Sequence, residues 1–579
     1  MTRAVNDPAA FEVFRNAVSG LADEMAITIL RTAHSQIVAS SMDFSAALCD
    51  ASGRVIAQAN TCPVHLGSIP DAMESVIGEF GDGFRDGDVY LLNDPSLGGM
   101  HLPDVFAVSP VFAGGTLIGF AVTVVNHADV GGWAAGSMAV QSRSIFAEGI
   151  QVPPSRYVDA GVRNDTFLRL LLRNVREPEL FLGDLDSQLA AAHSGAAGLR
   201  GLVARYGPDG FRALVDELLG YSELLIRGAL ASAPDGTYQF EDFIDDDGLG
   251  GDRIGFRVAA TIAGDRIHFD FTGSSPQVDS ALNATPSFTR SACYASLQGA
   301  LGSVIPPNAG FYRAFSFTIP DGSILNARRP AARGARGLVA YRIIDTVLGA
   351  LAPVFPGQVP AAGDGGPDAV AVGITDASGD SHVYWDVLCG AWGARPDRDG
   401  VDGISPLGAN LANTPIEELE RSGHVRIDGY GYLTDTGGAG TWRGGLATFR
   451  DMTVLADASV QIRSDRRDHL PYGLDGGRPG TPSANLLHPG TDAEQLLPSK
   501  PLFNAPSGTR HRHVTAGGGG HGNPFSRDPH RVLADVLDGK VSLEAARTEY
   551  GVAIRDGRID EERTTELRST APVGLTPAG

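Results

Sequence analysis

The stretch NDPSLGGMHLPDV (residues 93–105) holds more polar chemistry than a turn requires. Its Asn, Asp, Pro and Gly residues set unusual backbone angles or cap backbone groups in turns. They do not account for His101 and Asp104, which stand three residues apart at the start of an apolar, strand-like run. A nearby imidazole and carboxylate can hold a divalent metal ion or share a proton. The stretch is therefore either a connecting loop or half of a site.

A predicted β-hairpin brings a second histidine to the same place. Residues 105–112 and 117–125 are apolar and flank the turn sequence AGGT, whose centre lies near Gly114. Antiparallel pairing then places residues opposite each other when their numbers sum to about 229, give or take two. Asp104 faces Val125, and His127 faces Leu102. His101, Asp104 and His127 are thus expected at the open end of this hairpin.

A second predicted hairpin contributes Asp43. The sequence DFSAALCDASGRVIAQAN turns at residues 51–53, so Asp43 is expected beside Asn60, with His65 just beyond. Two imidazoles and two carboxylates that are open to water suit a catalytic Zn²⁺ or Mn²⁺. Such an ion could lower the pKa of bound water from 15.7 toward about 7. Taken singly, a loop histidine and a strand-end aspartate have ordinary structural explanations.

The helices and strands predicted around these residues indicate an α+β fold class. Residues 7–34 are predicted to form a helix, with Asp7 as N-cap and Pro8 in the first turn. Residues 44–130 are predicted as β structure, 165–230 as helices, 285–301 as a helix, 350–525 as glycine-rich loops, and the tail as two short helices. We expect three domains: 1–235, with the N-terminal helix, a β-hairpin-rich metal-binding part and a helical segment; 236–530, a second β-rich domain with Gly-rich loops; and 531–579, a helical C-terminal tail.

Composition narrows the class of protein. The chain has 579 residues, 43% of them hydrophobic, and a formal net charge of −22, which disfavours nucleic-acid binding. No secretory signal or membrane span is expected, because the uncharged run after Asp104 is interrupted by Ser109, Pro110 and the Gly114–Gly115 pair. Four cysteines without a C-x-x-C pattern indicate neither a disulfide framework nor a thiolate zinc site. A cytoplasmic location is expected.

Other motifs in the sequence are weaker evidence for a functional site. DDDGLGG (245–251) lacks the spacing and final Glu of a calcium loop. TAGGGGHGNP (515–524) lacks the Gly-Lys-Ser/Thr ending of a P-loop, and DTGGAGTWRGG (435–445) is typical of a tight backbone crossing. No G-x-S-x-G elbow of a serine hydrolase is present. No nucleotide site of its own is predicted for the chain.

Several blocks together resemble the signature sequences of the hydantoinase B/5-oxoprolinase family. They span most of the chain from about residue 10 to 550, and they are NDPSLGGMHLPD, NHADVGGWAAGSM, IFAEGIQVPP, FDFTGSSPQ, DTGGAGTWRGG and GGGGHGNPFSRDP. This family comprises B-type subunits of ATP-dependent N-methylhydantoinases and caprolactamase, and is related to subunits of acetone and acetophenone carboxylases. The resemblance implies an A-type partner that uses ATP to activate the substrate, with an α2β2 heterotetramer expected.

The resemblance also implies roles for individual residues. The family's metal ligands fall on Asp43, His101, Asp104 and His127, the same four residues that the hairpins bring together. The implied reaction is hydrolytic opening of a hydantoin or lactam ring at one divalent metal ion, Zn or Mn, with ATP bound by the partner subunit.

Three further residues are candidates for roles in the reaction, and two positions differ from the usual family sequence. Glu148 and Asp129 are candidates for proton transfer and His65 for orienting the metal ligands. Many family members have His where this chain has Asn126, and His521 stands where the family usually has Tyr.

Two alternative functions stay open. One is a subunit of an ATP-dependent ketone carboxylase, and the other is a non-catalytic scaffold subunit with a structural metal.

Overall fold

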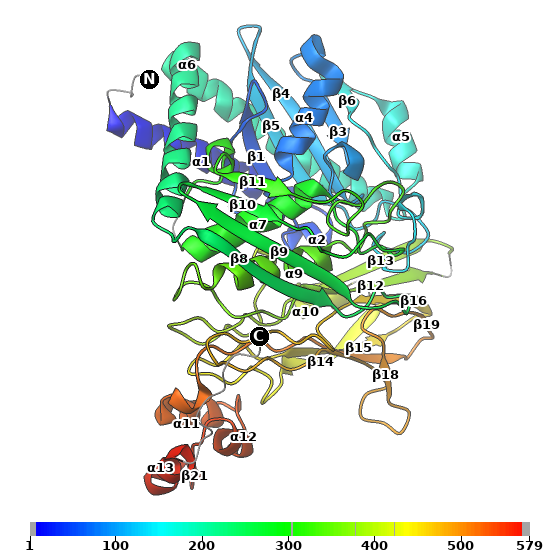
Figure 1. The fold of residues 1–579 in the computed structure, drawn as a ribbon. Coiled ribbons are helices and arrows are strands. Elements are labelled where there is room, and N and C mark those ends of the chain that lie inside the picture. Colours follow the sequence, from blue (N-terminus) through cyan, green and yellow to red (C-terminus); the bar gives the residue numbers. More distant parts are fainter. Residues whose placement is uncertain (1–6, 303–304, 377, 422, 570–579) are drawn as a thin grey trace.

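The computed structural model describes residues 7–302, 305–376, 378–421 and 423–569 (Figure 1). It is an α+β structure with several sheets, an N-terminal helix and a helical C-terminal segment, as predicted. The helices are α1 (Pro8–Thr32), α2 (Gln36–Ala39), α3 (Pro63–Leu66), α4 (Ile69–Phe80), α5 (Asp165–Arg173), α6 (Pro178–Ala231), α7 (Pro286–Leu301), α8 (Ala309–Tyr312), α9 (Gly337–Leu351), α10 (Ile416–Glu420), α11 (Pro529–Leu537), α12 (Leu543–Thr548) and α13 (Glu561–Ser569).

A seven-stranded antiparallel sheet forms the centre of the N-terminal half. Its order is β2 (Val55–Gln58), β1 (Phe44–Asp50), β5 (Thr116–Asn126), β4 (Asp104–Ala113), β3 (Val89–Leu92), β6 (Ser155–Asp159) and β7 (Val162–Arg163). Side chains alternate between its faces. Ala46 and Leu48 of β1 pack with α1 and α6, whereas Ala47 and Cys49 join the larger core on the other face. Both faces are therefore buried.

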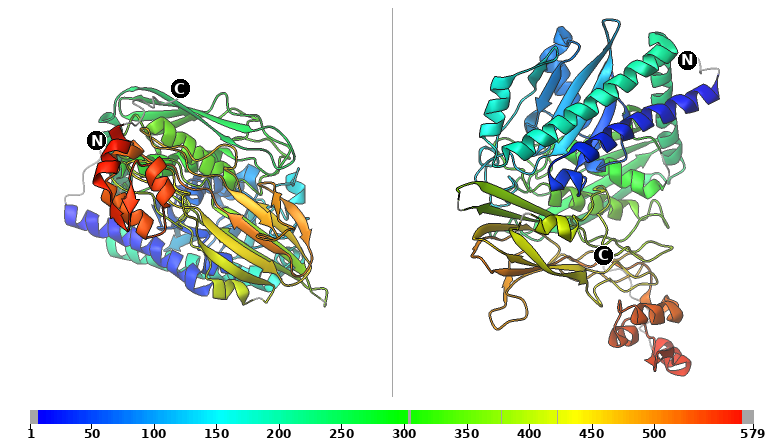
Figure 2. Two further views of the ribbon diagram at one scale, coloured as in Figure 1. Left: turned by 90° about the horizontal axis from the view of Figure 1, so that it is seen from below. Right: turned by 180° about the vertical axis from the view of Figure 1, so that it is seen from behind.

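The two long helices α1 and α6 lie side by side across one face of this sheet (Figure 2, right). The N-cap Asp7 accepts hydrogen bonds from the backbone N–H groups of Ala9 and Ala10, so the predicted start of α1 is confirmed. Helix α6 is interrupted at Gly207, where φ is +71° and Pro208 follows. The predicted helical region 165–230 is also confirmed, as α5 and α6.

The expectation of continuous β structure over residues 44–130 was wrong for α4. Ile69, Ala72, Met73 and Val76 recur at helical spacing, and all four are buried against the larger core. Pro70 lies in the first turn, where its missing N–H costs no hydrogen bond. The helix lies between the first hairpin and β3.

Three further sheets build the second half. The first is β11 (Phe315–Thr318), β10 (Arg266–Asp270), β9 (Ile254–Ala263) and β8 (Gly236–Ile244). The second is β13 (Ser381–Leu388), β12 (Asp368–Thr375), β16 (Ala458–Arg463) and β19 (Leu502–Ala505). The third is β14 (Val425–Tyr432), β15 (Thr448–Val454), β20 (Arg510–Val514), β17 (Ala484–Leu487) and β18 (Gln495–Leu497).

The glycine-rich region 350–525 carries many short strands joined by loops, so the β-rich character predicted for this part of the chain is confirmed. Its glycines allow backbone segments to cross closely: a Cβ on Gly444 would lie 1.9 Å from the carbonyl oxygen of Gly518. The predicted crossing at DTGGAGTWRGG is confirmed by this contact.

The C-terminal segment extends away from the rest of the chain (Figure 1). It contains α11, α12, the small hairpin β21 (Ile554–Arg555) and β22 (Arg558–Ile559), and then α13. Two short helices were expected here, and the structure adds the third. In the described ranges, every helix is too short or too polar to cross a bilayer. The division into three domains stays a prediction, and the largest apolar cluster draws side chains from both sides of residue 235.

Candidate metal centre

The register of three neighbouring strands sets the position of the predicted ligands. β5 lies between β4 and β1, so Asp104 pairs with Asn126 and Phe44 pairs with Val125. The hairpin turn has positive φ at Gly114 and Gly115, as a tight turn between twisted strands requires. The expected pairing therefore holds to within one residue. Its consequence is that Asp43, just before β1, and Asp104, the first residue of β4, lie on either side of Asn126.

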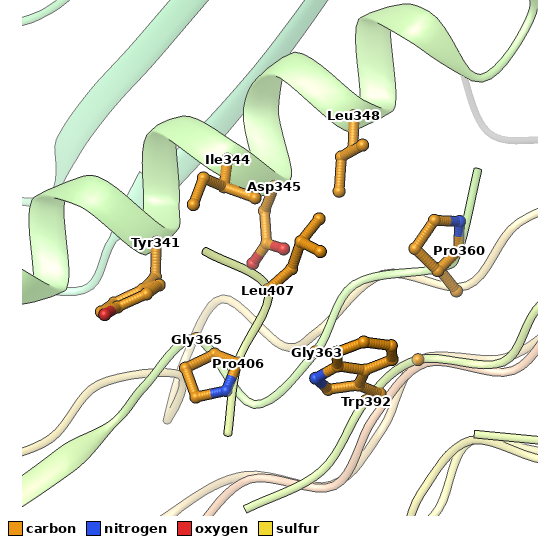
Figure 3. A pocket seen from close by; sticks show the side chains of 12 residues that line it. Tyr341, Ile344, Asp345, Leu348, Pro360, Gly363, Gly365, Trp392, Pro406 and Leu407 are labelled. Carbon is orange, nitrogen blue, oxygen red and sulfur yellow. The ribbon is translucent and has the colours of Figure 1, made fainter. Parts of the chain in front are cut away.

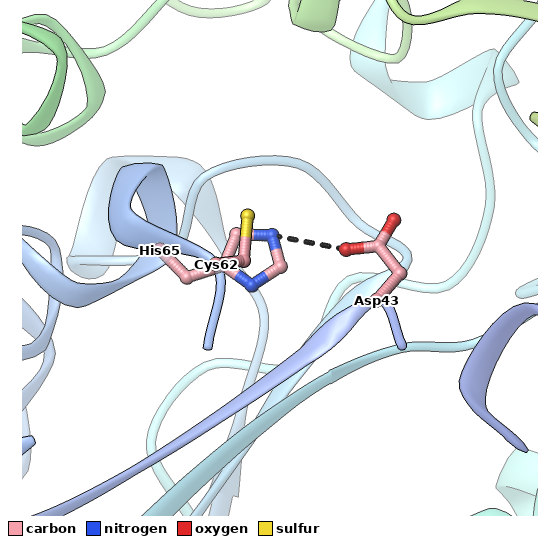
Figure 4. Close-up of side chains that lie close together, drawn as sticks. All are labelled: Asp43, Cys62 and His65. Carbon is pink, nitrogen blue, oxygen red and sulfur yellow. Dashed lines mark ion pairs between the residues drawn. The ribbon is translucent and has the colours of Figure 1, made fainter. Parts of the chain in front are cut away.

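The chain after the first hairpin brings two further ligand-type side chains to Asp43. Cys62 precedes α3, and His65 lies within it. The Nε2 atom of His65 is 3.4 Å from Oδ1 of Asp43 (Figure 4). The same atom is 3.8 Å from Oδ1 of Asp104. Asp43, Cys62 and His65 offer three ligand atoms within 4.8 Å of one another, the one such cluster among the described residues. Asn60, expected beside Asp43, is exposed and donates its N–H to Asp23 instead.

His101 and Asp104 contact each other directly. The Nδ1 atom of His101 lies 2.7 Å from Oδ2 of Asp104, which also pairs with the guanidinium of Arg336. The other carboxylate oxygen, Oδ1, is buried without a hydrogen-bond partner. Asp43 in turn accepts a hydrogen bond of 2.8 Å from the side-chain amide of Asn126. The departure from the family pattern at Asn126 thus places a neutral donor beside one predicted ligand.

His127 faces a different neighbour. Its Nε2 atom is 3.1 Å from Oε1 of Gln188, and its ring lies 4.2 Å from that of Phe181. The amide nitrogen of Gln188 donates to the carbonyl of Val105 at 2.9 Å, which turns its oxygen toward His127. The proton of His127 is therefore placed on Nε2, because only a donor fits opposite this oxygen. The Nδ1 atom is buried and without a partner among the described residues.

The two proton-transfer candidates lie in loops outside this group. Asp129 accepts hydrogen bonds from the N–H groups of Gly131 and Gly136 and pairs with Arg176 at 2.8 Å. Glu148 accepts from the N–H groups of Arg333 and Gly334. Both carboxylates thus hold loops in place, and Glu148 fixes the segment that carries Arg336. The proton-transfer roles stay predictions.

A cavity of about 480 Å³, the candidate metal cavity, lies beside these side chains. Its polar lining comprises Asp43, Cys62, His65, His101, Asn126, Arg336, Tyr341 and Arg463. Tyr341 of α9 also lines a second cavity of about 420 Å³, between α9 and the glycine-rich loops (Figure 3). The described lining of the candidate metal cavity includes neither His127 nor Asp104.

Burial sets the protonation of these groups. Burial lowers the pKa of His101 to about 4, and the nearby guanidinium of Arg336 adds to this effect. Burial raises the pKa of Asp43, and the charge of Asp104 acts in the same direction. Burial opposes ionisation of Asp104 as well, but Arg336 and His101 hold its pKa well below the usual range. At neutral pH His101 is therefore an uncharged imidazole, the form that ligates metals.

The donor set fits a divalent metal ion. Buried polar atoms in folded proteins nearly always have partners, yet Oδ1 of Asp104 and Nδ1 of His127 have none among the described residues. Two buried carboxylates with two or three imidazoles carry the donor types that zinc and manganese accept. A cation beside them would also offset the repulsion between Asp43 and Asp104.

The sequence analysis did not identify four residues that lie in this region, namely Cys62, Gln188, Arg336 and Arg463. Cys62 could have been found from its spacing, since Cys62 and His65 stand three residues apart on one turn. Arg336, Arg463 and Gln188 carried no signal, because each reaches the site from an element far away in the sequence.

The sequence matches the hydantoinase B/oxoprolinase family over residues 7–524. It is 36% identical to a protein from Pseudomonas sp. (strain NS671) that is named as the putative B-type subunit of a D-/L-hydantoinase, with 97% of this chain and 98% of that protein covered.

Two solved structures share the fold. The crystal structure of ATP-dependent caprolactamase from Pseudomonas jessenii superimposes with a TM-score of 0.90 at 31% identity, covering 98% of this chain and 100% of that chain. A nucleotide-free structure of acetone carboxylase superimposes with a TM-score of 0.90 at 20% identity, covering 97% and 83%, and this likeness concerns the fold alone. The family match and these similarities lead to one conclusion: the chain belongs to the hydantoinase B/oxoprolinase family.

Proposed function

We propose that this chain is the metal-dependent catalytic subunit of an ATP-dependent cyclic amidase that opens a hydantoin or lactam ring. The observation that carries the proposal is the candidate metal cavity, where Asp43, His65 and His101 meet beside Asp104 with ligand atoms left unpartnered. Relatives named as a hydantoinase component and as a caprolactamase support the substrate class. The word "subunit" in the names of relatives supports a partner, proposed here to be an A-type ATP-hydrolysing subunit in an α2β2 assembly, with ATP bound by the partner.

The proposed metal ligands are Asp43, His101, Asp104 and His127, with His65 and Cys62 within reach of Asp43. Either Zn²⁺ or Mn²⁺ suits carboxylate and imidazole donors, and a thiolate ligand would favour zinc. When bound, the ion would supply an acidified water or a polarised carbonyl.

The protein's own groups prepare this chemistry. Gln188 holds the proton of His127 on Nε2 and leaves Nδ1 free to ligate. Ser45 lies 3.5 Å from Nδ1 of His65 and orients its Nε2 atom toward the two carboxylates. His65 is therefore placed to hold or move a proton at Nε2, within 4 Å of the carboxylates of Asp43 and Asp104. The apolar wall of the cavity, including Ile37 and Val387, limits access of water.

The test combines metal analysis with turnover. The chain is purified with its partner, its metal content is measured, and ring opening of hydantoins and lactams is followed with and without ATP. We expect ATP-dependent ring opening that chelation abolishes and that added zinc or manganese restores. Full turnover by metal-free protein would refute the proposal. A requirement for bicarbonate together with a carboxylated product would instead identify the ketone carboxylase alternative.

A further inference from the structure

Arg463, the last residue of β16, carries a positive charge into the candidate metal cavity without a carboxylate partner. Its Nη1 atom contacts Sδ of Met138 at 3.3 Å, and a thioether is a weak acceptor. Its Nε atom is buried with no acceptor. No carboxylate oxygen in the described chain lies within 4.0 Å of its guanidinium. Arg463 is only partly exposed, and a guanidinium whose Nε atom is shielded from water normally has an acceptor for it.

Three buried arginines of the same half of the chain are paired with carboxylates, whereas buried Arg333 donates only to backbone carbonyls. Arg450 pairs with Asp386, Arg466 with Asp242 and Asp345, and Arg527 with Asp399 and Asp535. Arg463 is partly exposed, unlike these three, and it lines a cavity where they contact carboxylates. Burial, with the like charge of Arg336, lowers its pKa to about 10, so the guanidinium remains charged at neutral pH.

Two other features lie beside Arg463 in the lining of the cavity. Arg336 pairs with Asp104 through Nη2, but its Nε atom is unpartnered and its guanidinium lies 4.1 Å from the centroid of the Phe288 ring. Helix α9 begins at the next residue, Gly337, and a Cβ there would lie 3.6 Å from the guanidinium of Arg463. The positive end of the α9 dipole thus points toward the space between the two arginines.

We propose that Arg463, together with Arg336 and the first turn of α9, forms an oxyanion-binding subsite that holds a phosphoryl or carboxylate group of the substrate. The planar guanidinium fork matches either oxyanion. A chain with a net charge of −22 repels anions overall, so a local positive wall is required to admit one.

This inference rests on the proposed function only in naming the cavity as the reaction site. Anion binding is therefore tested without turnover. Inorganic phosphate and acetate are titrated separately into the metal-free chain by calorimetry, and the thermal unfolding midpoint of each variant confirms that it is folded. Metal-free protein is used so that a bound ion cannot itself hold the anion.

We expect wild-type protein to bind at least one of the two probes. Arg463→Gln should weaken that binding by about tenfold to a hundredfold, since a charge-assisted hydrogen bond is lost. Arg463→Lys should lose less, because it keeps the charge without the fork. Arg467→Gln is the matched control, a half-buried arginine that donates to the carbonyl of Leu497 and does not line the cavity. It should bind like wild type.

The two probes separate the sources of the anion. Binding of phosphate alone assigns a phosphoryl group, and binding of acetate alone assigns a carboxylate. Absence of binding of both to the wild type, or equal binding by wild type and Arg463→Gln, would overturn the subsite. Arg463-dependent binding in a chain that proves to hold no metal would leave the subsite standing and refute the metal-dependent function.

Discussion

Two buried clusters of charge in this protein differ in one respect. The arginine–aspartate network, made of Asp242, Arg342, Asp345, Asp465, Arg466 and Lys500, pairs every one of its carboxylates with a cation. Beside the candidate metal cavity there are two carboxylates, but Oδ1 of Asp104 has no hydrogen-bond partner, and Asp43 contacts the amide of Asn126 and the imidazole of His65 without an arginine or lysine. Both clusters are buried to a similar degree.

The difference separates structural charge from functional charge. The network joins β8, α9 and the segment after β16, so its attractions act between parts of the chain that must stay together. The cavity leaves ligand atoms uncommitted at the ends of β1 and β4, where a cation can complete them. Burial of charge alone therefore does not identify a site, whereas an unpartnered charged atom beside a cavity does.

The largest effect is expected from breaking the network. Asp242→Asn removes the carboxylate shared by Arg342 and Arg466 and leaves two buried cations underpaired. The free energy of unfolding should fall by about 3 to 5 kcal/mol, because removing one partner strands the other charges. Thermal and denaturant unfolding measure this effect. Asp321→Asn, in the exposed pair with Arg328, should change little. If Asp242→Asn lost metal rather than stability, the two clusters would not be separable in this way.

The second prediction concerns a carboxylate beside the candidate metal cavity, where metal affinity is expected to change. Asp104→Asn keeps the shape of the side chain but removes its charge, and we expect metal affinity to fall by about a hundredfold to a thousandfold. Competition with a chromogenic chelator measures this affinity. The control is Asp88→Asn, a buried carboxylate outside the cavity that accepts from the hydroxyl of Tyr90. Equal metal affinity of wild type and Asp104→Asn would remove this residue from the ligand set.

A smaller effect is expected from Gln188, which touches His127 but none of the other proposed ligands. Gln188→Leu removes the acceptor that holds the proton on Nε2, and metal affinity should fall about tenfold to a hundredfold. Nitrogen NMR of the metal-free histidine should show a mixed tautomer in the variant and a single one in wild type. Ser187→Ala is the control, since its hydroxyl bonds only within α6. An unchanged tautomer would contradict the assignment.

Glu148 belongs neither to the arginine–aspartate network nor to the candidate metal cavity. It is a buried carboxylate that accepts hydrogen bonds only from the backbone N–H groups of Arg333 and Gly334. Burial raises its pKa to about 7 from a usual value of about 4.5. The folded state then binds more protons than the unfolded state between these values, so stability should fall as pH rises through this window.

Glu148→Gln should remove this dependence, by about 1 to 2 kcal/mol between pH 5 and pH 7. The measurement is the difference between the unfolding midpoints of variant and wild type across that range. A difference that does not change with pH would show that Glu148 is ionised throughout.

Local patterns predicted much of the fold and part of the site. Apolar spacing and a good N-cap predicted α1, and the Gly114–Gly115 turn predicted the register that places Asp104 beside Asn126. These features depend on interactions between residues close in sequence. Helix α4 was missed because its short apolar face follows a strong hairpin signal and contains a proline.

The basic side of the cavity could not be predicted from the sequence. Arg336 and Arg463 are separated by more than a hundred positions, and only the tertiary fold brings the start of α9 to the end of β16. Gln188 faces His127 because α6 crosses the central sheet, a tertiary contact with no local signature. By contrast, His101 and Asp104 share one loop, and their short separation was visible at once.

The central position of β5 gives the hairpin two ends with different dynamics. At Gly114 and Gly115 the backbone turns in open space, whereas at Asn126 it is held between β1 and β4 by Asp43 and Asp104. An ion at that end would tie three strands together. Amide hydrogens near Asn126 should then exchange with deuterated solvent far more slowly once the ion is bound, while those near the turn keep their rate. A reporter group attached at Gly114 or Gly115 would therefore not disturb the strand ends around Asn126.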